Sequence, residues 1–378
     1  MSASEAHIKS TIALAAGGTG GHMFPAESLA QELGRRGHEI VLVTDNRGAR
    51  YANDFPCAAR FEISAATPSV GGPIAKAAAA FSIAGGLFTS LRRFKELGVD
   101  AVVGFGGYPS LPAVKAADIL KLPYGLHEQN GVLGRTNRLL EGNARFLAHG
   151  FSNLAKSKRT SRLTEEVGNP IRDAVKDLVG VSFTAPVEGE QIRLLIFGGS
   201  QGAAIFSRVV APALEALAPS LRNRLSVLQQ AREAEADEIK AVYARCGIDA
   251  EIAPFFSDLP DRMAKAHLII SRSGASTVSE ISAVGRPSIL VPLKIAMDDH
   301  QTGNAKALTE TGGAILLPED EFTPSALTEV LSGLLQSPQR LTDMASRAKG
   351  RVKSNAAARL AELVEANLMR APNVGKAA

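Results

Sequence analysis

The stretch TIALAAGGTGGHMFPAESLAQELGRRGHEIVLVTD (11–45) decides the fold class of this chain. Its apolar runs at 11–16 and 39–45 have the length of buried strands, and the segment between them carries apolar residues at helical spacing. Pro25 is expected in the opening turn of this helix, where its missing N–H has little cost, and Gly37 is expected to end it. The stretch therefore predicts a strand–helix–strand unit.

The same alternation continues through both halves of the chain. A third apolar run, 100–107, follows in the first half, and the second half opens with IRLLIF (192–197), a glycine loop and a helical segment, 203–221. Strands that alternate with helices indicate a doubly wound parallel sheet. We therefore predict an α/β protein with two Rossmann-like domains that face a cleft. Further strands of the second half are expected at 226–231, 267–271 and 288–293.

The length of the chain, 378 residues, exceeds that of a typical single domain and suggests two. The segment 167–191 contains several turn formers and no strong periodicity, so we place the interdomain boundary near Pro170. The predicted domains are 1–170 and 171–352. The last stretch, about 353–370, is alanine-rich with a helical pattern and could pack back on the first domain.

The composition excludes several classes of protein. A formal net charge of +4 favours anionic ligands or an anionic membrane surface, and it is too small to indicate nucleic-acid binding. Cys57 and Cys246 have no paired spacing, which argues against a disulfide framework or a zinc site and fits a reducing compartment. The polar amino terminus lacks the apolar core of a signal peptide, and the longest uncharged stretch, 77–91, is too short to span a membrane. We therefore expect a cytoplasmic protein.

Two glycine loops are the first candidates for a binding site. GGTGG (17–21) and GGSQG (198–202) each lie between a predicted strand and a predicted helix, where backbone N–H groups and the helix dipole suit a phosphate or pyrophosphate. The alternative is that the glycines only permit tight turns. A nicotinamide-dependent enzyme is a rival interpretation, because Asp45 closes the second strand where a ribose partner is expected. Met23 replaces the third glycine of that fingerprint, so we favour a cleft between two domains over a single dinucleotide site.

Seven short motifs occur between residues 17 and 305, and together they resemble those of the MurG family of bacterial N-acetylglucosaminyltransferases. Each motif alone is a weak signal, whereas seven in the order of the family are specific. The motifs are GGTGGHMFP (17–25), GGYPS (106–110), HEQN (127–130), GNPIR (168–172), GGSQG (198–202), SRSGASTVSE (271–280) and DDHQTGNA (298–305).

The resemblance implies the GT-B architecture and a transferase that needs no cofactor. It implies that the second domain binds UDP-N-acetylglucosamine and that the first binds lipid I, the undecaprenyl-diphosphate-linked muramyl-pentapeptide. The sugar would be transferred with inversion to the 4-hydroxyl of the muramyl sugar, which gives lipid II in peptidoglycan synthesis. Two other classes stay open: an enzyme similar to UDP-N-acetylglucosamine 2-epimerase, which shares the two-domain shell, and an NAD-linked oxidoreductase.

The resemblance also assigns residues that bind the nucleotide of the donor. Ser200 and Arg172 match positions near the UDP diphosphate, and Arg172 would act through charge-assisted hydrogen bonds. Glu280 matches a carboxylate that binds the ribose. Phe256 lies where the backbone of the family reads the uracil edge, so its side chain is expected to matter less.

The donor sugar has candidate contacts in both domains. His300 and Gln301 match the segment of the family that contacts the sugar. This chain has DDHQ where some relatives have DRQQ, which leaves open which of the two side chains makes the key hydrogen bond. The residues of the first domain expected to approach the sugar are Thr19, Gly20, Gly21 and Asn130.

Two residues compete for the role of catalytic base. An inverting transfer needs a group that takes the proton of the acceptor hydroxyl. His22 is the first candidate, because imidazole is the side chain best matched to neutral pH, and its alternative role is to bind the acceptor diphosphate. Glu128 is the second candidate, or else a carboxylate that orients Asn130 or its loop. Tyr108 could hydrogen-bond either substrate or only pack.

No dedicated metal site is predicted. Arg172 and the amino terminus of the helix after the second glycine loop are expected to neutralise the leaving diphosphate. Asp298 and Asp299 are the adjacent acidic pair with some claim to a metal, and a solvated turn is the more ordinary interpretation.

The segment PIAKAAAAFSIAGGLFTSLRRFK (73–95) has a pattern typical of an interfacial helix, with apolar residues beside basic ones. A lipid-linked acceptor would bring the first domain to the bilayer, so we predict peripheral attachment to the cytoplasmic face of the plasma (inner) membrane. The alternative is an ordinary core helix with a basic end. The predicted membrane-facing residues are Ile74, Lys76, Phe81, Leu87, Phe88, Arg92 and Arg93.

Overall fold

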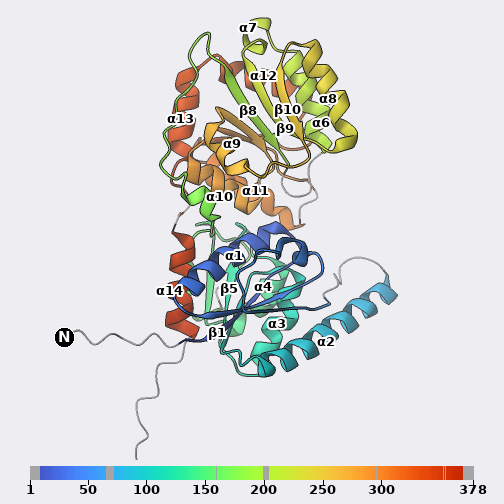
Figure 1. Ribbon diagram of the computed structural model, residues 1–378, viewed down its shortest axis with the longest axis vertical. Coiled ribbons are helices and arrows are strands. Elements are labelled where there is room, and N and C mark those ends of the chain that lie inside the picture. Colours follow the sequence, from blue (N-terminus) through green and yellow to red (C-terminus); the bar gives the residue numbers. More distant parts are fainter. Residues whose placement is uncertain are drawn as a thin grey trace, which may run out of the picture. The chain divides into compact units, whose positions relative to one another are not determined.

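The computed structural model describes residues 9–64, 72–158, 160–198, 204–294, 297–351, 353 and 355–368. The chain divides into two compact units, each with its own sheet (Figure 1). The first comprises Met1–Arg172 and Asn355–Ala378, and the second comprises Asp173–Ser354. The division therefore falls two residues after the boundary placed near Pro170, and the last segment of the chain is counted with the first unit.

The first unit contains a seven-stranded parallel sheet in the order β3-β2-β1-β4-β5-β6-β7. The inner strands β2, β1, β4, β5 and β6 are almost wholly buried, as expected of a parallel sheet covered by helices, whereas the edge strands β3 and β7 are partly exposed. The strands are β1 Thr11–Ala15, β2 Glu39–Thr44, β3 Ala59–Glu62, β4 Ala101–Gly104, β5 Tyr124–Glu128, β6 Phe146–His149 and β7 Thr164–Glu166.

Helices cover both faces of this sheet. Along β1, Ile12 and Leu14 face a core to which α1 and α14 contribute, whereas Ala13 and Ala15 face a core to which α2 and α3 contribute. The alternation explains why all of 12–15 is apolar. The helices are α1 Gly20–Arg35, η1 Gly48–Tyr51, α2 Pro73–Glu96, α3 Gly107–Ile119, α4 Arg135–Leu140, η2 Glu141–Asn143 and α14 Ala356–Leu368.

Helix α1 begins earlier than its sequence pattern predicts. The carbonyl of Thr19 accepts hydrogen bonds from the N–H groups of His22 (3.1 Å) and Met23 (3.2 Å), so the first turn forms inside the glycine loop. Pro25 consequently lies in the second turn, and its placement in the opening turn was wrong. Gly37 does end the helix: its φ of 90° is a left-handed conformation that favours glycine.

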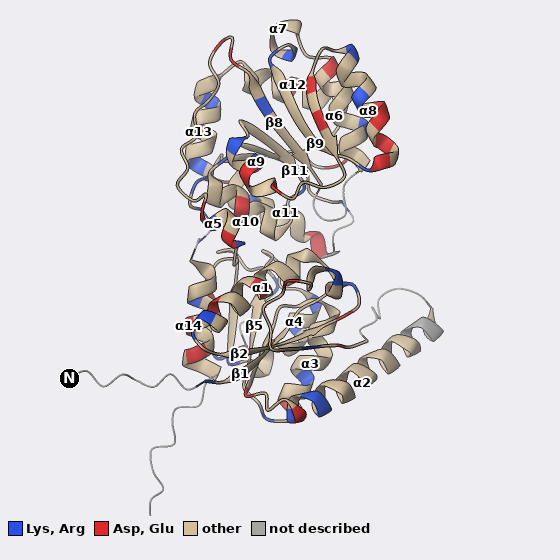
Figure 2. Cartoon of the chain, in the orientation of Figure 1, with Lys and Arg blue, Asp and Glu red and all other residues tan. Residues whose placement is uncertain are grey.

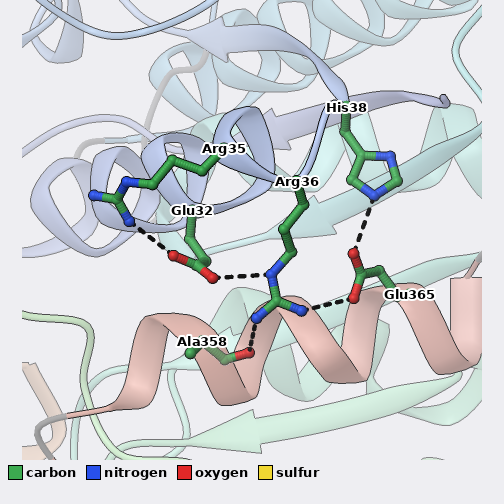
Figure 3. Close-up of polar contacts among 6 residues, drawn as sticks. All are labelled: Glu32, Arg35, Arg36, His38, Ala358 and Glu365. Carbon is green, nitrogen blue, oxygen red and sulfur yellow. Dashed lines mark hydrogen bonds and ion pairs between the residues drawn. The ribbon is translucent and has the colours of Figure 1, made fainter. Parts of the chain in front are cut away.

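A polar network attaches α14 to the end of α1 (Figure 3). The carboxylate of Glu365 accepts a hydrogen bond from Arg36 at 2.7 Å and lies 3.2 Å from Nε2 of His38. Arg36 also donates to the carbonyl of Ala358 (3.3 Å) and to Glu32 (2.9 Å). One guanidinium thus joins the side chains and backbone of two helices that are more than 300 residues apart in the sequence.

Helix α2 exposes large apolar side chains. Phe81 is 80% exposed and Phe88 is 70% exposed, seven residues apart and therefore on one face of the helix. Leu87 differs from its predicted membrane-facing role, because it packs against the core. Arg93 also turns inward, with its guanidinium 5.6 Å from the ring centre of Phe61. The side chains of Ile74 and Lys76 lie outside the described residues. Within the described part of the chain, no helix is both long enough and apolar enough to span a membrane.

The second unit contains a six-stranded parallel sheet in the order β10-β9-β8-β11-β12-β13. Strand β8 coincides with the predicted run 192–197, whereas β12 stops three residues short of its predicted end. The strands are β8 Ile192–Phe197, β9 Leu225–Gln230, β10 Asp249–Ala253, β11 Leu268–Ser271, β12 Ser288–Leu290 and β13 Ala314–Leu316.

The helices of the second unit follow the predicted alternation with one difference. The helical segment predicted at 203–221 divides in two, because α6 stops at Glu215 and Pro219 begins a new helix. The helices are α5 Asp173–Lys176, α6 Ala204–Glu215, α7 Pro219–Arg222, α8 Glu233–Arg245, α9 Leu259–Lys265, α10 Ala275–Val284, η3 Met297–Asp299, α11 His300–Thr309, α12 Pro324–Leu335 and α13 Pro338–Ala348.

Candidate functional site

Each sheet reverses its strand order at one point, and a glycine-containing loop lies on each side of that point. In the first unit the reversal separates β1 from β4, which lead into α1 and α3. In the second unit it separates β8 from β11, which lead into α6 and α10. Doubly wound folds bind ligands at such points, outside the carboxyl ends of the strands. The candidate site of each unit is therefore the carboxyl edge of its sheet.

Asp45 has a structural role in the first glycine loop. Its carboxylate accepts hydrogen bonds from the backbone N–H of Gly18 (2.8 Å) and of Gly48 (2.9 Å) and from Nε of Arg47 (3.0 Å). The side chain is buried. Because Asp45 uses its oxygens to fix the loop, it is not available as the ribose partner that the dinucleotide interpretation requires.

His22 lies where two predicted motifs meet. It is half-buried in the first turn of α1, and its Nδ1 is 3.5 Å from Oγ1 of Thr19. A Cβ atom built at Gly107, the first residue of α3, would lie 3.5 Å from Cε1 of His22. The imidazole therefore lies close to the GGYPS loop, and the φ of 72° at Gly107 is what favours glycine there. Tyr108, the next residue, is half-buried at the same edge.

Glu128 ends β5 and organises the loop that follows. Its carboxylate accepts hydrogen bonds from the backbone N–H (3.1 Å) and Nδ2 (3.0 Å) of Asn130, from the N–H of Gly134 (2.9 Å) and from Nδ2 of Asn137 (2.9 Å). Burial raises the pKa of this carboxyl, and the four hydrogen bonds oppose that shift. Both oxygens are engaged, so the geometry favours the orienting role over that of a base.

His127 connects the HEQN and GNPIR motifs. Its Nε2 lies 3.0 Å from the carbonyl of Gly168, which can only accept, so Nε2 carries the proton. Nδ1 then accepts from Nε2 of Gln129 at 3.2 Å, and Asn169 donates to the carbonyl of Gln129 at 2.9 Å. Burial lowers the pKa of His127 to about 4, so the ring is neutral at physiological pH. The network holds Gly168 and Asn169 against the end of β5.

Arg172 is the last residue of the first of the two segments that make up the first unit. Its guanidinium carbon lies 5.3 Å from the ring centre of Phe24 on α1, and Ser28 donates to the carbonyl of Ile171 at 3.1 Å. Arg172 falls within the second domain as predicted from the sequence, 171–352. The described contacts of this guanidinium and of the preceding residue bind the segment to α1 instead.

The second glycine loop begins at the carboxyl end of β8. The N–H of Gly198 donates to Oε1 of Gln230 at 3.0 Å, and Nε2 of Gln230 donates to the carbonyl of Pro254 at 3.0 Å. One side chain thus ties together the loops that follow β8, β9 and β10. Ser200 lies outside the described residues.

The loop after β11 and helix α11 are joined by hydrogen bonds. Ser273 donates from its hydroxyl to the carbonyl of Gln301 at 2.9 Å, and Asn304 donates to the carbonyl of Ser273 at 3.1 Å. Oε1 of Gln301 accepts from the N–H of Leu293 at 3.0 Å. The structure therefore brings the SRSGASTVSE and DDHQTGNA motifs into one cluster, through residues that are 28 and 31 positions apart in the sequence.

His300 is the first residue of α11, immediately after Asp298 and Asp299. Both aspartates adopt left-handed backbone, with φ of 57° and 54°. Aspartate tolerates this conformation better than most residues, because its short side chain can bond locally. The acidic pair therefore serves the turn into α11. Within the described ranges, no cluster of three or more His, Cys, Asp or Glu side chains could hold a metal ion.

Glu280 and Phe256 occupy buried positions of the second unit. Glu280 lies on α10, which begins just after Gly274. Phe256 is buried with Arg262 over its ring, 4.4 Å from the ring centre, while the neighbouring Phe255 is exposed. The Phe256 side chain thus supports the loop after β10, which agrees with a minor direct role for it.

Asn137, which donates to Glu128, and the ion pair of Arg272 with Glu319 (2.9 Å) were not identified from the sequence. Arg272 is a buried side chain, and it belongs to the motif SRSGASTVSE (271–280). A cation directly after the apolar run of β11 is the sequence signal that could have identified it. Asn137 and Glu319 lie outside every motif. Asn137 lies 9 residues from its partner Glu128 and Glu319 lies 47 residues from Arg272, so no short motif contains either pair.

Both halves of the chain match one family. Residues 12–147 match the glycosyltransferase family 28 N-terminal domain, and residues 193–364 match the family 28 C-terminal domain. A protein of Caulobacter vibrioides (strain NA1000 / CB15N), named UDP-N-acetylglucosamine–N-acetylmuramyl-(pentapeptide) pyrophosphoryl-undecaprenol N-acetylglucosamine transferase, is 45% identical over 353 residues, which are 93% of this chain and 97% of that protein. A Rhodospirillum rubrum protein with the same name is 46% identical over 355 residues, 94% of this chain and 91% of its own.

Solved structures give the same result. The crystal structure of Acinetobacter baumannii MurG has a TM-score of 0.76 and 31% identity, and the match covers 94% of this chain and 99% of that one. A UDP-N-acetylglucosamine 2-epimerase has a TM-score of 0.65 at 15% identity, with 94% and 96% covered, which is a likeness of fold alone. The epimerase interpretation is therefore not favoured. The chain belongs to glycosyltransferase family 28, among the UDP-N-acetylglucosamine–N-acetylmuramyl-(pentapeptide) pyrophosphoryl-undecaprenol N-acetylglucosamine transferases.

Proposed function

We propose that this enzyme transfers N-acetylglucosamine from UDP-N-acetylglucosamine to the 4-hydroxyl of the muramyl sugar of lipid I, which gives lipid II. The observation that carries the proposal is the 45% identity to the Caulobacter vibrioides transferase over 93% of the chain. The loop networks at the carboxyl edges of both sheets support it, because they hold the residues that the sequence resemblance assigned to the two substrates.

In this proposal the second unit holds the donor. Glu280 binds the ribose hydroxyls, and the backbone beside Phe256 reads the uracil edge. Gln301 contacts the sugar, since its amide oxygen is held by Leu293 and its NH₂ group remains as a donor. The amino terminus of α6 and Ser200 receive the diphosphate. Arg172 remains the cation that the resemblance assigns to the diphosphate.

His22 is the base in this proposal. Its imidazole takes the proton of the acceptor hydroxyl as that oxygen attacks C1 of the donor sugar. The bond from C1 to the diphosphate oxygen breaks, and UDP leaves with the electron pair, so the configuration at C1 inverts. The geometry of Glu128 supports this assignment, because both of its carboxylate oxygens already accept hydrogen bonds from residues that follow β5. Thr19, Gly20, Gly21 and Asn130 are the residues of the first unit proposed to contact the transferred sugar, and Tyr108 contacts a substrate.

We also propose peripheral attachment to the cytoplasmic face of the inner membrane through α2. The two exposed phenylalanines, Phe81 and Phe88, would enter the interface between headgroups and acyl chains. Figure 2 shows basic residues at the carboxyl end of the helix, where Arg92 is 64% exposed and can approach anionic headgroups. Loss of sedimentation with anionic vesicles for Phe81→Ser/Phe88→Ser would support this role, whereas unchanged sedimentation would contradict it.

The function is tested by following the sugar. Enzyme, UDP-N-acetylglucosamine labelled in the sugar and lipid I should move the label into a butanol-extractable lipid, with UDP released in equal amount. Incubation without lipid I is the control and should leave the label in the donor. If UDP is released or the donor is isomerised without transfer to lipid, the proposed function is refuted.

A further inference from the structure

Residues 291–294, which directly follow β12, are held by side chains from three other segments. Arg272 donates from Nη1 to the carbonyls of Val291 (3.2 Å) and Pro292 (3.1 Å). The next two residues donate from their backbone N–H groups. Leu293 donates to Oε1 of Gln301 at 3.0 Å, and Lys294 donates to Oε2 of Glu319 at 2.9 Å. Each of the four consecutive residues therefore has a backbone group bound by a side chain.

Arg272 and Glu319 also bind each other. Nη1 of Arg272 lies 2.9 Å from Oε2 of Glu319, the oxygen that accepts from the N–H of Lys294. The side chains are 10% and 24% exposed, so water screens the pair only in part. The two hydrogen bonds lower the pKa of Glu319 against the effect of its partial burial, which keeps it a carboxylate at neutral pH.

The arginine reaches a third element as well. Its guanidinium carbon lies 5.6 Å from the ring centre of Phe206 on α6, and Phe206 is fully buried. Helix α6 follows the second glycine loop, and Gln301 lies in the first turn of α11. The pair thus stands between the helix assigned to the diphosphate and the segment assigned to the sugar.

We infer that Arg272 and Glu319 form a positioning pair that sets how Gln301 presents its amide to the donor sugar. The inference rests on the proposed function and deepens it. With residues 291–294 fixed, the N–H of Leu293 requires the oxygen of the Gln301 amide, and the NH₂ group is left to donate. The site then recognises an oxygen of the sugar as acceptor. Neither residue of the pair touches the reacting atoms.

The pair is tested by comparing two ligands that differ in the sugar. Glu319→Ala removes the acceptor of the Lys294 N–H and should weaken UDP-N-acetylglucosamine binding about tenfold, the effect of one hydrogen bond to a charged group. Binding of UDP, which lacks the sugar, should change less than twofold. Calorimetric titration of the full chain measures both affinities, and the melting temperature reports folding.

Asp320→Ala is the matched control. This neighbouring carboxylate lies 3.3 Å from Nζ of the same Lys294, but both side chains are more than 60% exposed, and this contact joins the two side chains rather than the backbone of 291–294. Its removal should leave both affinities unchanged. Glu319→Gln keeps an oxygen for the N–H of Lys294 and should restore part of the lost sugar affinity, which a merely structural change would not predict.

The outcomes separate this inference from the proposed function. Equal losses of UDP and UDP-N-acetylglucosamine affinity in Glu319→Ala, or no loss of either, overturn the positioning pair. Wild-type enzyme that binds UDP-N-acetylglucosamine but does not transfer the sugar overturns the proposed reaction and leaves the binding comparison valid. Wild-type enzyme that binds neither ligand overturns both.

Discussion

At the scale of single residues, Glu280 is the clearest test of the donor site. A ribose contact is made equally in the ground state and in the transition state, so its loss should weaken binding without slowing the chemistry. Glu280→Ala should raise the KM for UDP-N-acetylglucosamine about tenfold and lower kcat by less, as expected for one hydrogen bond to a carboxylate. Steady-state kinetics at saturating lipid I measures both. A fall in kcat with unchanged KM would contradict the ribose role.

A second residue-scale prediction concerns His127 and pH. Its pKa is about 4 in the folded chain and near 6.5 when the side chain is exposed. Between these values the unfolded chain binds a proton that the folded chain does not, so the free energy of unfolding falls as pH falls from 6.5 towards 4, by up to about 3 kcal/mol. Urea denaturation at several pH values measures this slope. His127→Gln should make it shallower, and an identical slope in the variant would count against the assignment.

At the scale of elements, the docking of α14 depends on one carboxylate. Glu365 pairs with Arg36 and His38, and the His38 side chain is almost fully buried. Glu365→Ala leaves both partners without this acceptor and should lower the free energy of unfolding by about 1 to 3 kcal/mol. Thermal and urea denaturation of the full chain measure the change.

The matched control for α14 is Glu362→Ala. Glu362 is exposed on the same helix. Its substitution removes the same charge and changes the helix propensity by the same amount as Glu365→Ala, but it spares the network. Its effect on stability should stay within about 0.5 kcal/mol. Equal destabilisation by the two variants would show that the network around Arg36 does not hold the helix.

At the scale of the whole molecule, the sequence predicts those helices and strands that are determined by residues close together in the chain. Strands β1 and β8 are short apolar runs ahead of glycine loops, and their length and the glycines that follow identify them. Where prediction and structure differ, the cause is distant in sequence. The run 288–293 has the composition of a strand, but side chains from three other segments bind the backbone beyond Leu290, so β12 ends there.

The candidate site also has features that the sequence predicts and features that it does not. The motifs predicted which loops carry the site, because glycine and polar residues after a strand are visible in any single sequence. They did not predict the pairing of Arg272 with Glu319, which lie 47 residues apart, or the donors that surround Glu128. Leu87 was predicted to face a membrane, but it packs against the core. An apolar side chain fits both positions equally, so only the packing of the folded chain distinguishes them.

The attachment of α14 to the first unit has a consequence for how the protein is made. The first unit needs the last helix of the chain, but the ribosome must synthesise the roughly 180 residues of the second unit before that helix emerges. At about 5 to 20 residues per second, the delay is roughly 10 to 40 seconds. During that time the apolar surface that Leu360 and Val364 later cover is open to water or to a chaperone. A nascent chain stalled before Asn355 should therefore bind chaperone, and release through Leu368 should end that binding.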